Sequence, residues 1–465
     1  MAATRIERDS IGEMEIPADA DYGIHTARAV ANFPITGILL RHYPELVQSF
    51  AMAKKAAAMA NRDLEVLNPG IAAAIISACD LIVAGDGLGQ FVVDMLQGGA
   101  GTSTNMNANE VVANIALKLM GRPRGDYATI NPNDHVNLSQ STNDVYPTAV
   151  RLTILRNCPE LIASQQALKE ALLQKAVEFD DVIKVGRTQL MDAVPMRLGS
   201  EFRAFAVMVG EDIDRLREFA NLLREVNLGG TAIGTGINTP EGYSALVIRH
   251  LSEVSGVSLV AAGDLIEATS DTGAFITFSG VLKRTAVKLS KICNDLRLLN
   301  SGPRTGLGEI RLPAVQAGSS IMPGKVNPVI PEVVNQIAYQ VIGNDLTVTM
   351  AAEAGQLQLN AMEPVIVLNI LQSMRMLMRG MQVLREKCIL GIEADRERCR
   401  ELLEGSLVTV TAINPYIGYA AASRVAKEAL KSRRSIRDVV LAEELMTEAQ
   451  LTEAFATDNL LGIRR

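Results

Sequence analysis

The stretch VLKRTAVKLSKICNDLRLL, residues 281–299, decides the fold class of this 465-residue chain. Its apolar residues recur near the 3.6-residue period of an α-helix. We expect one face of that helix to carry Val281, Val287, Leu289, Ile292, Leu296 and Leu299. The pattern extends back to about residue 264, and a helix of about 30 residues is roughly 45 Å long. The stretch therefore predicts one rod of a large helical bundle.

Four other stretches predict long helices, over about residues 145–180, 200–226, 331–354 and 363–392. Five such rods form a bundle, and their broad apolar surfaces predict burial against other chains as well. Shorter helices are expected elsewhere. Residues 43–84 predict two, broken at Asn68-Pro69-Gly70. Residues 435–455 predict two more, the second opening with a capping-box pattern at Thr447-x-x-Gln450. The expected fold is all-α with three domains: an N-terminal helical domain (1–140), a central domain of five long helices (141–395) and a small C-terminal helical domain (396–465).

Composition excludes several classes of protein. The chain is 48% hydrophobic and 21% charged, which is ordinary for a globular protein, and its net charge of -7 argues against nucleic-acid binding. No run approaches the roughly 20 apolar residues of a membrane span, and the N-terminus has no signal-peptide core. The five cysteines lie far apart without a CxxC pair, which predicts free thiols and a cytoplasmic location. The four histidines lack zinc-site spacing, and the 4% aromatic content indicates an aliphatic core that suits helix packing.

Five polar segments rich in Ser, Thr, Asn and Gly interrupt the apolar pattern. They are Gln97–Glu110, Asn131–Asp144, Gly186–Pro195, Asn227–Pro240 and AGSSIMPGKVNP at residues 317–328. Each one alone is explained as a helix cap or turn. Five together, with hydroxyl pairs and a single lysine at 325, favour a site for anions. Neutral hydroxyls and amides can hold carboxylates without burying many charges.

Three of these segments resemble the aspartase/fumarase superfamily. The residues that carry the resemblance are GSSIMPGKVNP (318–328), QSTNDVYPT (140–148) and GRTQLMDAVP (186–195), and it extends from Tyr22 to Tyr419. The first motif is the signature of that superfamily and is highly specific. The resemblance implies an all-helical homotetramer whose active sites are each built from three chains. It also implies anti-elimination from a succinyl-type substrate to give fumarate.

Two positions bear on the leaving group. Fumarases typically carry HPND and GRTH, whereas this chain has Asn131 and Gln189 at the histidine positions. A His–Glu pair suits the activation of water, because histidine titrates near neutrality, and Gln189 cannot titrate. Ammonia leaves from a protonated amine more easily than water leaves from a hydroxyl, and its departure needs less help from an acid. Some aspartases keep a histidine at the position of Gln189. This glutamine therefore indicates an adjustment of the site within the superfamily and is not proof of one activity. The expected reaction is reversible loss of ammonia from L-aspartate to give fumarate, and the alternative is a class II fumarase with altered motifs.

The chemistry requires donors where negative charge develops. Removing the weakly acidic Cβ proton of aspartate yields a doubly charged aci-carboxylate, and placing donors at such a charge is usually the largest catalytic contribution. The resemblance makes Ser319 the base, on a loop that closes over bound substrate. Backbone N–H groups around Gly318–Ile321, with Lys325, would stabilise its alkoxide. The resemblance implies these ligands: Thr102, Ser141, Thr142 and Ser320 for the β-carboxylate, Thr188, Lys325 and Asn327 for the α-carboxylate, and Asn143 and Gln189 for the amino group.

The sequence says less about a cofactor and about the roles of a few other polar residues. No cofactor is expected to be required, although some aspartases respond to a divalent ion such as magnesium. Glu267 and Asp271 lie one turn apart, and either form a solvated face or hold such an ion; no D-x-D-x-D cluster supports the second interpretation. His135 has either a structural hydrogen bond or a place near the site. The expected partners are L-aspartate, fumarate, ammonia and further copies of the chain, with no nucleic acid and no membrane.

Overall fold

A computed structural model describes residues 3–461 and is all-α, as predicted. Within those residues the strands form four small two-stranded sheets. The β1–β2 (Thr4–Asp9, Gly12–Pro17), β3–β4 (Ile183–Thr188, Met191–Arg197) and β7–β8 (Ile310–Arg311, Glu393–Ala394) pairs are antiparallel, and β5–β6 (Glu225–Val226, Val260–Ala261) is parallel. The chain forms two compact units. Among the described residues, the first consists of 3–162, 214–284 and 340–376, and the second of 163–213, 285–339 and 377–461.

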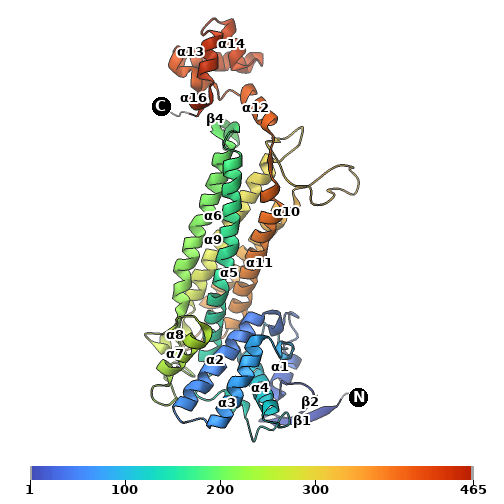
Figure 1. Ribbon diagram of the computed structural model, residues 1–465, viewed down its shortest axis with the longest axis vertical. Coiled ribbons are helices and arrows are strands. Elements are labelled where there is room, and N and C mark those ends of the chain that lie inside the picture. Colours follow the sequence, from blue (N-terminus) through green and yellow to red (C-terminus); the bar gives the residue numbers. More distant parts are fainter. Residues whose placement is uncertain (1–2, 462–465) are drawn as a thin grey trace. The chain divides into compact units, whose positions relative to one another are not determined.

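The five predicted long helices are present: α5 (Thr142–Glu178), α6 (Leu198–Ala220), α9 (Gly273–Leu299), α10 (Val329–Glu353) and α11 (Glu363–Lys387) (Figure 1). Three of them are shorter than expected, and the third is α11, which was predicted to reach residue 392 but ends at Lys387, before a short 3-10 turn. The chain leaves the helix at Asp271, which is extended at φ -80°, ψ 132°, so residues 265–270 form a separate short helix, α8 (Leu265–Ser270). The helix predicted to reach residue 226 ends at Ala220, and a 3-10 turn and β5 follow it. The three-domain division at residues 140 and 395 stays a prediction, and residues 1–2 and 462–465 of its outer domains lie outside the described residues.

In each unit, polar bonds join neighbouring long helices. In the first unit, Asp345 of α10 accepts hydrogen bonds from Ser279 Oγ at 2.8 Å and from Lys283 Nζ at 2.5 Å, both on α9. In the second, Asn335 Nδ2 of α10 donates to Ser290 Oγ of α9 at 2.8 Å. Four of these partners, Ser279, Ser290, Asn335 and Asp345, are buried, and their bonds fix the register between helices whose contact is otherwise apolar.

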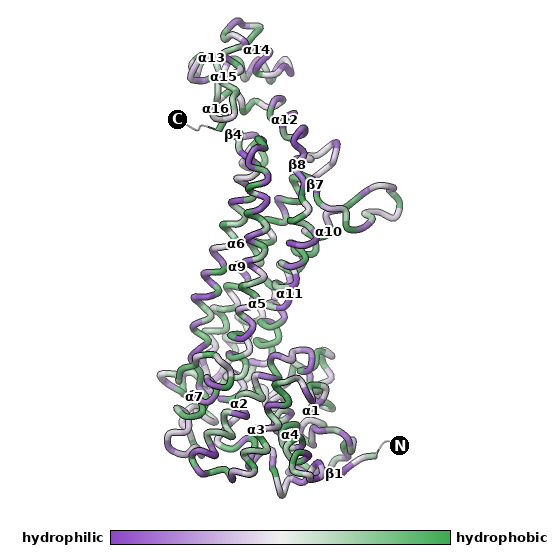
Figure 2. The backbone as a smooth tube through the Cα atoms, viewed as in Figure 1, coloured by the Kyte–Doolittle hydropathy of each residue, from purple (hydrophilic) through white to green (hydrophobic). Residues whose placement is uncertain are grey.

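Five of the six residues that were predicted to form the apolar face of α9 are buried. Val281, Leu289, Ile292, Leu296 and Leu299 are buried, whereas Val287 is 50% exposed. At 100° per residue Val287 lies roughly 120° from Val281 around the helix, outside the face that the other five residues share. Hydrophobic residues recur along the whole length of the long helices (Figure 2).

The shorter helices begin where the sequence supplies caps. The break predicted at residues 68–70 separates α2 (Pro44–Asp63) from α3 (Pro69–Ala84), and the Asn68 side chain accepts hydrogen bonds from Gly70 N and Ile71 N. Helix α2 packs against α3, α4 (Thr102–Leu119) and α7 (Tyr243–Ser255). In the second unit, Thr447 and Gln450 form the predicted capping box of α15 (Glu448–Ala454), which shares a core with α13 (Val410–Ser432) and α14 (Ile436–Ala442).

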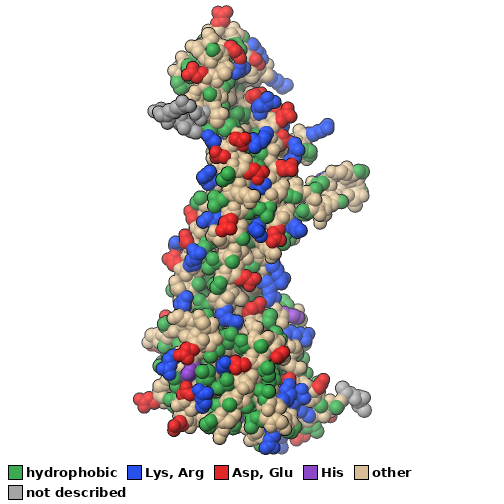
Figure 3. All heavy atoms as spheres, in the orientation of Figure 1, with side chains coloured by type: hydrophobic (Ala, Val, Ile, Leu, Met, Phe, Trp, Pro, Cys, Tyr) green, Lys and Arg blue, Asp and Glu red, His purple; other side chains and the backbone are tan. Residues whose placement is uncertain are grey.

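Charged side chains of both signs are intermingled over the face that Figure 3 shows. In the part of the chain that is described, no helix has both the length and the apolar character that crossing a membrane requires.

Candidate functional site

The first cluster of candidate residues lies where α5 begins. Ser141 caps this helix: its Oγ accepts from Asn143 N at 3.2 Å, and Asp144 Oδ1 accepts from Ser141 N at 2.9 Å. Asp144 Oδ2 also accepts from Gly229 N and Thr231 N, each at 3.0 Å. Asp144 is buried and therefore ties the STND motif to residues 227–232. Burial raises the pKa of this carboxyl to about 6, against the lowering effect of its three backbone donors.

Asn143 owes its orientation to two neighbours. Pro147 has no N–H for the Asn143 carbonyl four residues earlier, and Asn227 Nδ2 donates to that carbonyl at 3.0 Å instead. The Asn143 side chain donates from Nδ2 to the Ala232 carbonyl at 2.7 Å. Because a carbonyl only accepts, this contact assigns the amide nitrogen and leaves Oδ1 as the acceptor that Asn143 presents.

Thr102 is the first residue of α4, and its Oγ1 donates to Gly99 O at 2.8 Å. The preceding Gly101 has φ +90° and lies under the ring of Tyr146, on α5. A Cβ at this glycine would lie 2.3 Å from Tyr146 Cδ2, so no other residue fits there. The contact holds the start of α4 against the start of α5, and so brings Thr102 into the same unit as Ser141, Thr142 and Asn143.

Behind Thr142 lies a buried lysine. Lys54 of α2 is 0% exposed, and its Nζ donates to Asn105 Oδ1 at 2.6 Å, Gln140 Oε1 at 2.9 Å and Asn137 Oδ1 at 3.0 Å. Asn105 Nδ2 donates in turn to Thr142 Oγ1 at 3.1 Å. Burial lowers the pKa of the Lys54 ammonium to about 7, although the Asp144 carboxylate acts in the opposite direction.

The second cluster lies in the second unit, on the loop before α10. Ser319 Oγ accepts from Met322 N at 3.0 Å and from Ile321 N at 3.2 Å. The base of the loop is closed by Gly318 N, which donates to Lys325 O at 2.8 Å, and by Asn327 Nδ2, which donates to Gly318 O at 2.5 Å. A Cβ on Gly318 would lie 2.5 Å from Lys325 O, so this glycine permits the close approach. Ser320 and Lys325 are exposed.

Thr188 and Gln189 lie on a β-hairpin that the sequence did not predict. Thr188 ends β3 and pairs with Met191 of β4, and the two-residue turn between them has φ +54° at Gln189 and +63° at Leu190. Such turns favour Asn and Gly, so two ordinary side chains here are held under backbone strain, which often marks a functional position.

A buried carboxylate links this hairpin to the chain that leads into the serine loop. Glu309, 0% exposed, accepts from Arg187 Nη1 at 2.9 Å, and Lys184 Nζ lies 3.0 Å from its Oε2. Both cations are on β3. Among the described residues no hydrogen bond or ion pair joins the Gln189 turn to Ser319; Glu309 ties β3 to the chain at a point ten residues before this serine.

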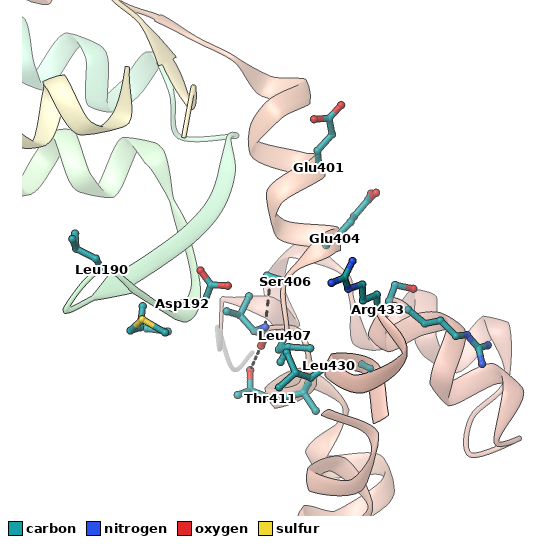
Figure 4. Close-up of a pocket in the computed structure, with 17 residues that line it drawn as sticks. Leu190, Asp192, Glu401, Glu404, Ser406, Leu407, Thr411, Leu430 and Arg433 are labelled. Atoms are coloured by element: carbon teal, nitrogen blue, oxygen red, sulfur yellow. Dashed lines mark hydrogen bonds between the residues drawn. The ribbon is translucent and has the colours of Figure 1, made fainter. Parts of the chain in front are cut away.

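The chain just beyond Gln189 borders a cavity of about 1100 Å³. Figure 4 shows Leu190 and Asp192 of the hairpin on one side and Glu404, Ser406 and Arg433 of the C-terminal helices on the other. None of the ten predicted site residues belongs to the described lining. The cavity is much larger than a four-carbon dicarboxylate needs, and Leu190 at its rim is 72% exposed.

Asn131 and His135, which stand at or near the position where a fumarase carries a histidine, make hydrogen bonds within their own turn. In residues 3–461 no cluster of three or more His, Cys, Asp and Glu side chains is placed to hold a metal ion. Asn131 caps the short turn of π-helix Pro132–Val136, with its Oδ1 accepting from Asn133 N at 2.8 Å. His135 Nδ1 accepts from Asn131 N at 2.9 Å, which gives this histidine a structural hydrogen bond.

The candidate residues thus form two sets. Thr102, Ser141, Thr142 and Asn143 lie together in the first unit, and Thr188, Gln189, Ser319, Ser320, Lys325 and Asn327 lie in the second. Sequence reasoning missed Lys54, Asn105, Asn227 and Glu309, which support the candidates from behind. One signal was present for Lys54: it recurs at helical spacing with Val47, Phe50 and Ala57 on the apolar face of α2.

The fold and the motifs define a lyase built on a bundle of long helices. Residues 12–343 match the family model described as Lyase, and residues 409–462 match the one described as Fumarase C C-terminus. The chain belongs to the aspartase/fumarase superfamily.

Curated relatives include the aspartate ammonia-lyase of Pseudomonas aeruginosa, 60% identical over 465 residues that cover 100% of this chain and 98% of the relative. That of Escherichia coli K12 is 55% identical over 458 residues, 98% of this chain and 96% of the relative. A crystal structure of fumarate lyase:delta crystallin from Brucella melitensis bound to cobalt is 59% identical, with a TM-score of 0.97 and coverage of 100% of both chains. Recombinant class II fumarase from Schistosoma mansoni is 33% identical, with a TM-score of 0.92 and coverage of 97% of this chain and 98% of that one.

Proposed function

We propose that the chain is an aspartate ammonia-lyase, which reversibly eliminates ammonia from L-aspartate to give fumarate. The observation that carries this proposal is the Asn143 amide, whose nitrogen is committed to the Ala232 carbonyl and whose oxygen is presented as an acceptor. A substrate ammonium group offers only N–H donors, so it fits that acceptor. The curated aspartate ammonia-lyases at 55–60% identity over the whole chain support the same activity.

Ser319 begins the reaction as an alkoxide and removes a proton from Cβ of aspartate. The electron pair left on Cβ moves into the β-carboxylate and gives the aci-carboxylate dianion, which the hydroxyls of Thr102, Ser141, Thr142 and Ser320 are proposed to bind. The C–N bond then breaks, nitrogen leaves as ammonia with its electron pair, and the new C=C bond completes fumarate.

The serine loop contains the donors that an alkoxide requires. The backbone N–H groups of Ile321 and Met322 already point at Ser319 Oγ, and donors to the charged form lower the pKa of an acid. Lys325 lies on the same loop and, with Thr188 and Asn327, is proposed to bind the α-carboxylate. Gln189 shares the amino group with Asn143. Closure of the loop would exclude water and strengthen each of these contacts.

We propose further that the active enzyme is a homotetramer in which three chains build each site. Helix α10 presents an exposed apolar stripe at helical spacing, with Tyr339, Leu346 and Met350 each at least 60% exposed. Such a stripe on a long helix suits burial against other copies of the chain.

The proposal includes a cytoplasmic location, supported by five buried cysteines that are all free thiols. Enzymes of this superfamily need no organic cofactor. Activation by a divalent ion such as magnesium rests on the family resemblance alone, and a comparison of turnover with magnesium and with a chelator tests it.

The experiment that tests the function compares two substrates. With the purified protein, L-aspartate should give fumarate, followed by its ultraviolet absorbance, together with one equivalent of ammonia. L-malate should give essentially none, because Asn131 and Gln189 stand where a fumarase carries histidines. Malate turnover comparable to that of aspartate would support the alternative, a class II fumarase with altered motifs, and would overturn the proposal.

A further inference from the structure

Lys54 occupies a position that the reaction above does not explain. It is completely buried, and its ammonium group donates to three side-chain amide oxygens, those of Asn105, Asn137 and Gln140. An ammonium has three N–H donors and no lone pair, so each atom that it contacts must accept. Lys54 therefore determines which end of each amide faces it.

The orientation of Asn105 sets the role of Thr142. With Oδ1 bound to Lys54, the Asn105 Nδ2 group faces Thr142 Oγ1 and donates to it at 3.1 Å. Thr142 Oγ1 is thereby an acceptor toward Asn105, and its own O–H is free to donate elsewhere. In residues 3–461 no hydrogen bond donated by this hydroxyl is found, so the proton is available to a ligand.

We propose that Lys54 is a positioning residue that fixes the direction of a hydrogen-bond relay, from Lys54 through Asn105 to Thr142, so that the Thr142 hydroxyl donates to the substrate β-carboxylate. The inference rests on the proposed function, because Thr142 is taken to face that carboxylate. A carboxylate only accepts, so a threonine whose hydroxyl pointed back to the protein would offer it a lone pair and repel it.

The cost of burying Lys54 supports a role of this kind. A buried ammonium is unfavourable unless its hydrogen bonds are satisfied, and burial lowers the pKa of Lys54 to about 7. The groups that face it from neighbouring helices are Asp144 of α5 and Cys79 of α3, in addition to the three amides. An apolar side chain of similar length would fill the same space without that cost.

The first test reverses the relay while keeping its shape. Asn105→Asp places an isosteric carboxylate that still accepts from Lys54 but can donate neither to Thr142 nor to Asn137 Oδ1, the second acceptor of Asn105 Nδ2 at 3.1 Å. The Thr142 hydroxyl must then turn toward the carboxylate. We expect roughly a hundredfold loss of kcat/KM for L-aspartate. Gln140→Glu is the control, because it puts the same charge against Lys54 and likewise gives up donated hydrogen bonds, here to the Val136 and Leu138 carbonyls, but makes no bond to Thr142. It should retain activity within about threefold of that of the wild type.

The second test is a double-mutant cycle with Lys54→Met and Thr142→Val. If Lys54 acts through Thr142, adding Lys54→Met to Thr142→Val should change kcat/KM by less than about twofold, although Lys54→Met alone causes a large loss. Lys55→Met serves as control, since Lys55 pairs with Asp80 outside the relay. Circular dichroism and chromatography establish that each variant is folded and assembled.

The outcomes separate this inference from the function on which it rests. A wild-type protein that makes no fumarate from aspartate overturns the proposed function. An active wild type with a folded, equally active Asn105→Asp variant overturns the relay alone, as do losses that multiply in the cycle. If Lys54→Met does not fold, Asn105→Asp against Gln140→Glu still decides the question, because both variants keep the lysine.

Discussion

The Ser319 oxygen accepts from the same two backbone N–H groups whether or not it carries its proton. With a proton, its oxygen caps a turn by accepting from Ile321 N and Met322 N. Without the proton, the same two N–H groups stabilise the alkoxide, because hydrogen bonds to the charged form favour it. The same local geometry therefore caps the loop and supports the proposed role of Ser319 as the base.

Ser319→Ala should lower kcat by several orders of magnitude while succinate, an unreactive dicarboxylate, still binds. The reason is that the decisive contact of Ser319 is made only in the transition state. Steady-state kinetics and calorimetric titration with succinate measure the two effects. A variant that kept more than about a tenth of the wild-type kcat would make another residue the base.

Glu363 makes a second prediction at the scale of a residue. Burial raises the pKa of this carboxyl from 4.5 to about 8, partly offset by Arg151, and its Oε2 has no hydrogen-bond partner in the described structure. The folded protein therefore binds a proton that the unfolded chain releases above pH 4.5. The contribution of Glu363 to the free energy of unfolding is therefore greatest below pH 4.5. It falls as the pH rises toward 8 and stays low at higher pH.

Glu363→Gln keeps the shape and removes that titration. We expect the melting temperature of the variant to rise relative to that of the wild type as the pH is raised from 5 to 8, by an amount that reflects a few kcal/mol per chain. Thermal unfolding at several pH values measures it. A difference between the two proteins that stays constant across this range would show that Glu363 is ionised throughout.

At the scale of elements, the start of α5 and residues 227–232 form one structure. Asp144 accepts from Gly229 and Thr231, and the Asn227 side chain satisfies the Asn143 carbonyl that Pro147 leaves without a donor. Neither segment holds Asn143 alone. This pairing accommodates a proline in the second turn of α5, close to Asn143, the proposed ligand of the amino group.

Asn227→Ala removes the donor to Asn143 O and should weaken the site for the amino group. In the reverse reaction we expect the KM for ammonia to rise about tenfold while the KM for fumarate changes little, because fumarate carries no amine. Initial rates with each substrate varied in turn measure both constants. Asn227→Asp should raise the KM for ammonia at least as much, because it puts a carboxylate oxygen against the Asn143 carbonyl in place of the donor. A parallel rise in both constants would instead indicate general disorder of the loop.

Local patterns predicted the helices because their causes are local. The cap at Asn68 and the capping box at Thr447 lie within four residues of the bonds they make, and the apolar period of α9 needs one helix only. The break at Asp271 was missed because Glu267 and Asp271 kept a helical spacing across it. The β3–β4 hairpin was missed because its turn, Gln189–Leu190, lacks the Asn or Gly that usually marks one.

The candidate site was predicted to the depth of its motifs and no further. Ser141, Thr142 and Asn143 became candidates because they stand in one recognisable run of sequence, and their role stays a prediction. Lys54 and Asn105 are 51 residues apart and meet only in the folded chain, so neither spacing nor composition could pair them. Supporting residues of this kind follow from tertiary contacts, which a single sequence does not contain.

At the scale of the whole molecule, the two sets of candidate residues belong to different compact units, and α10 presents its apolar stripe to the outside. Both features favour assembly with closed symmetry, in which the ends of long helices from different chains come together and the site is repeated. We expect Ser141–Asn143 from one chain, Thr188 from a second and Ser319 from a third in each site.

Refolding two inactive variants together tests this arrangement. Ser319→Ala and Thr188→Val are denatured in equal amounts, mixed and refolded. Each site draws its Thr188 and its Ser319 from different chains, so about a quarter of the sites, half times half, should contain both wild-type residues. Activity should recover toward that fraction of the activity of refolded wild type, while each variant refolded alone stays inactive. If the wild type regains activity under the same conditions and the mixture does not, both residues of a site come from a single chain, and the shared-site proposal is wrong.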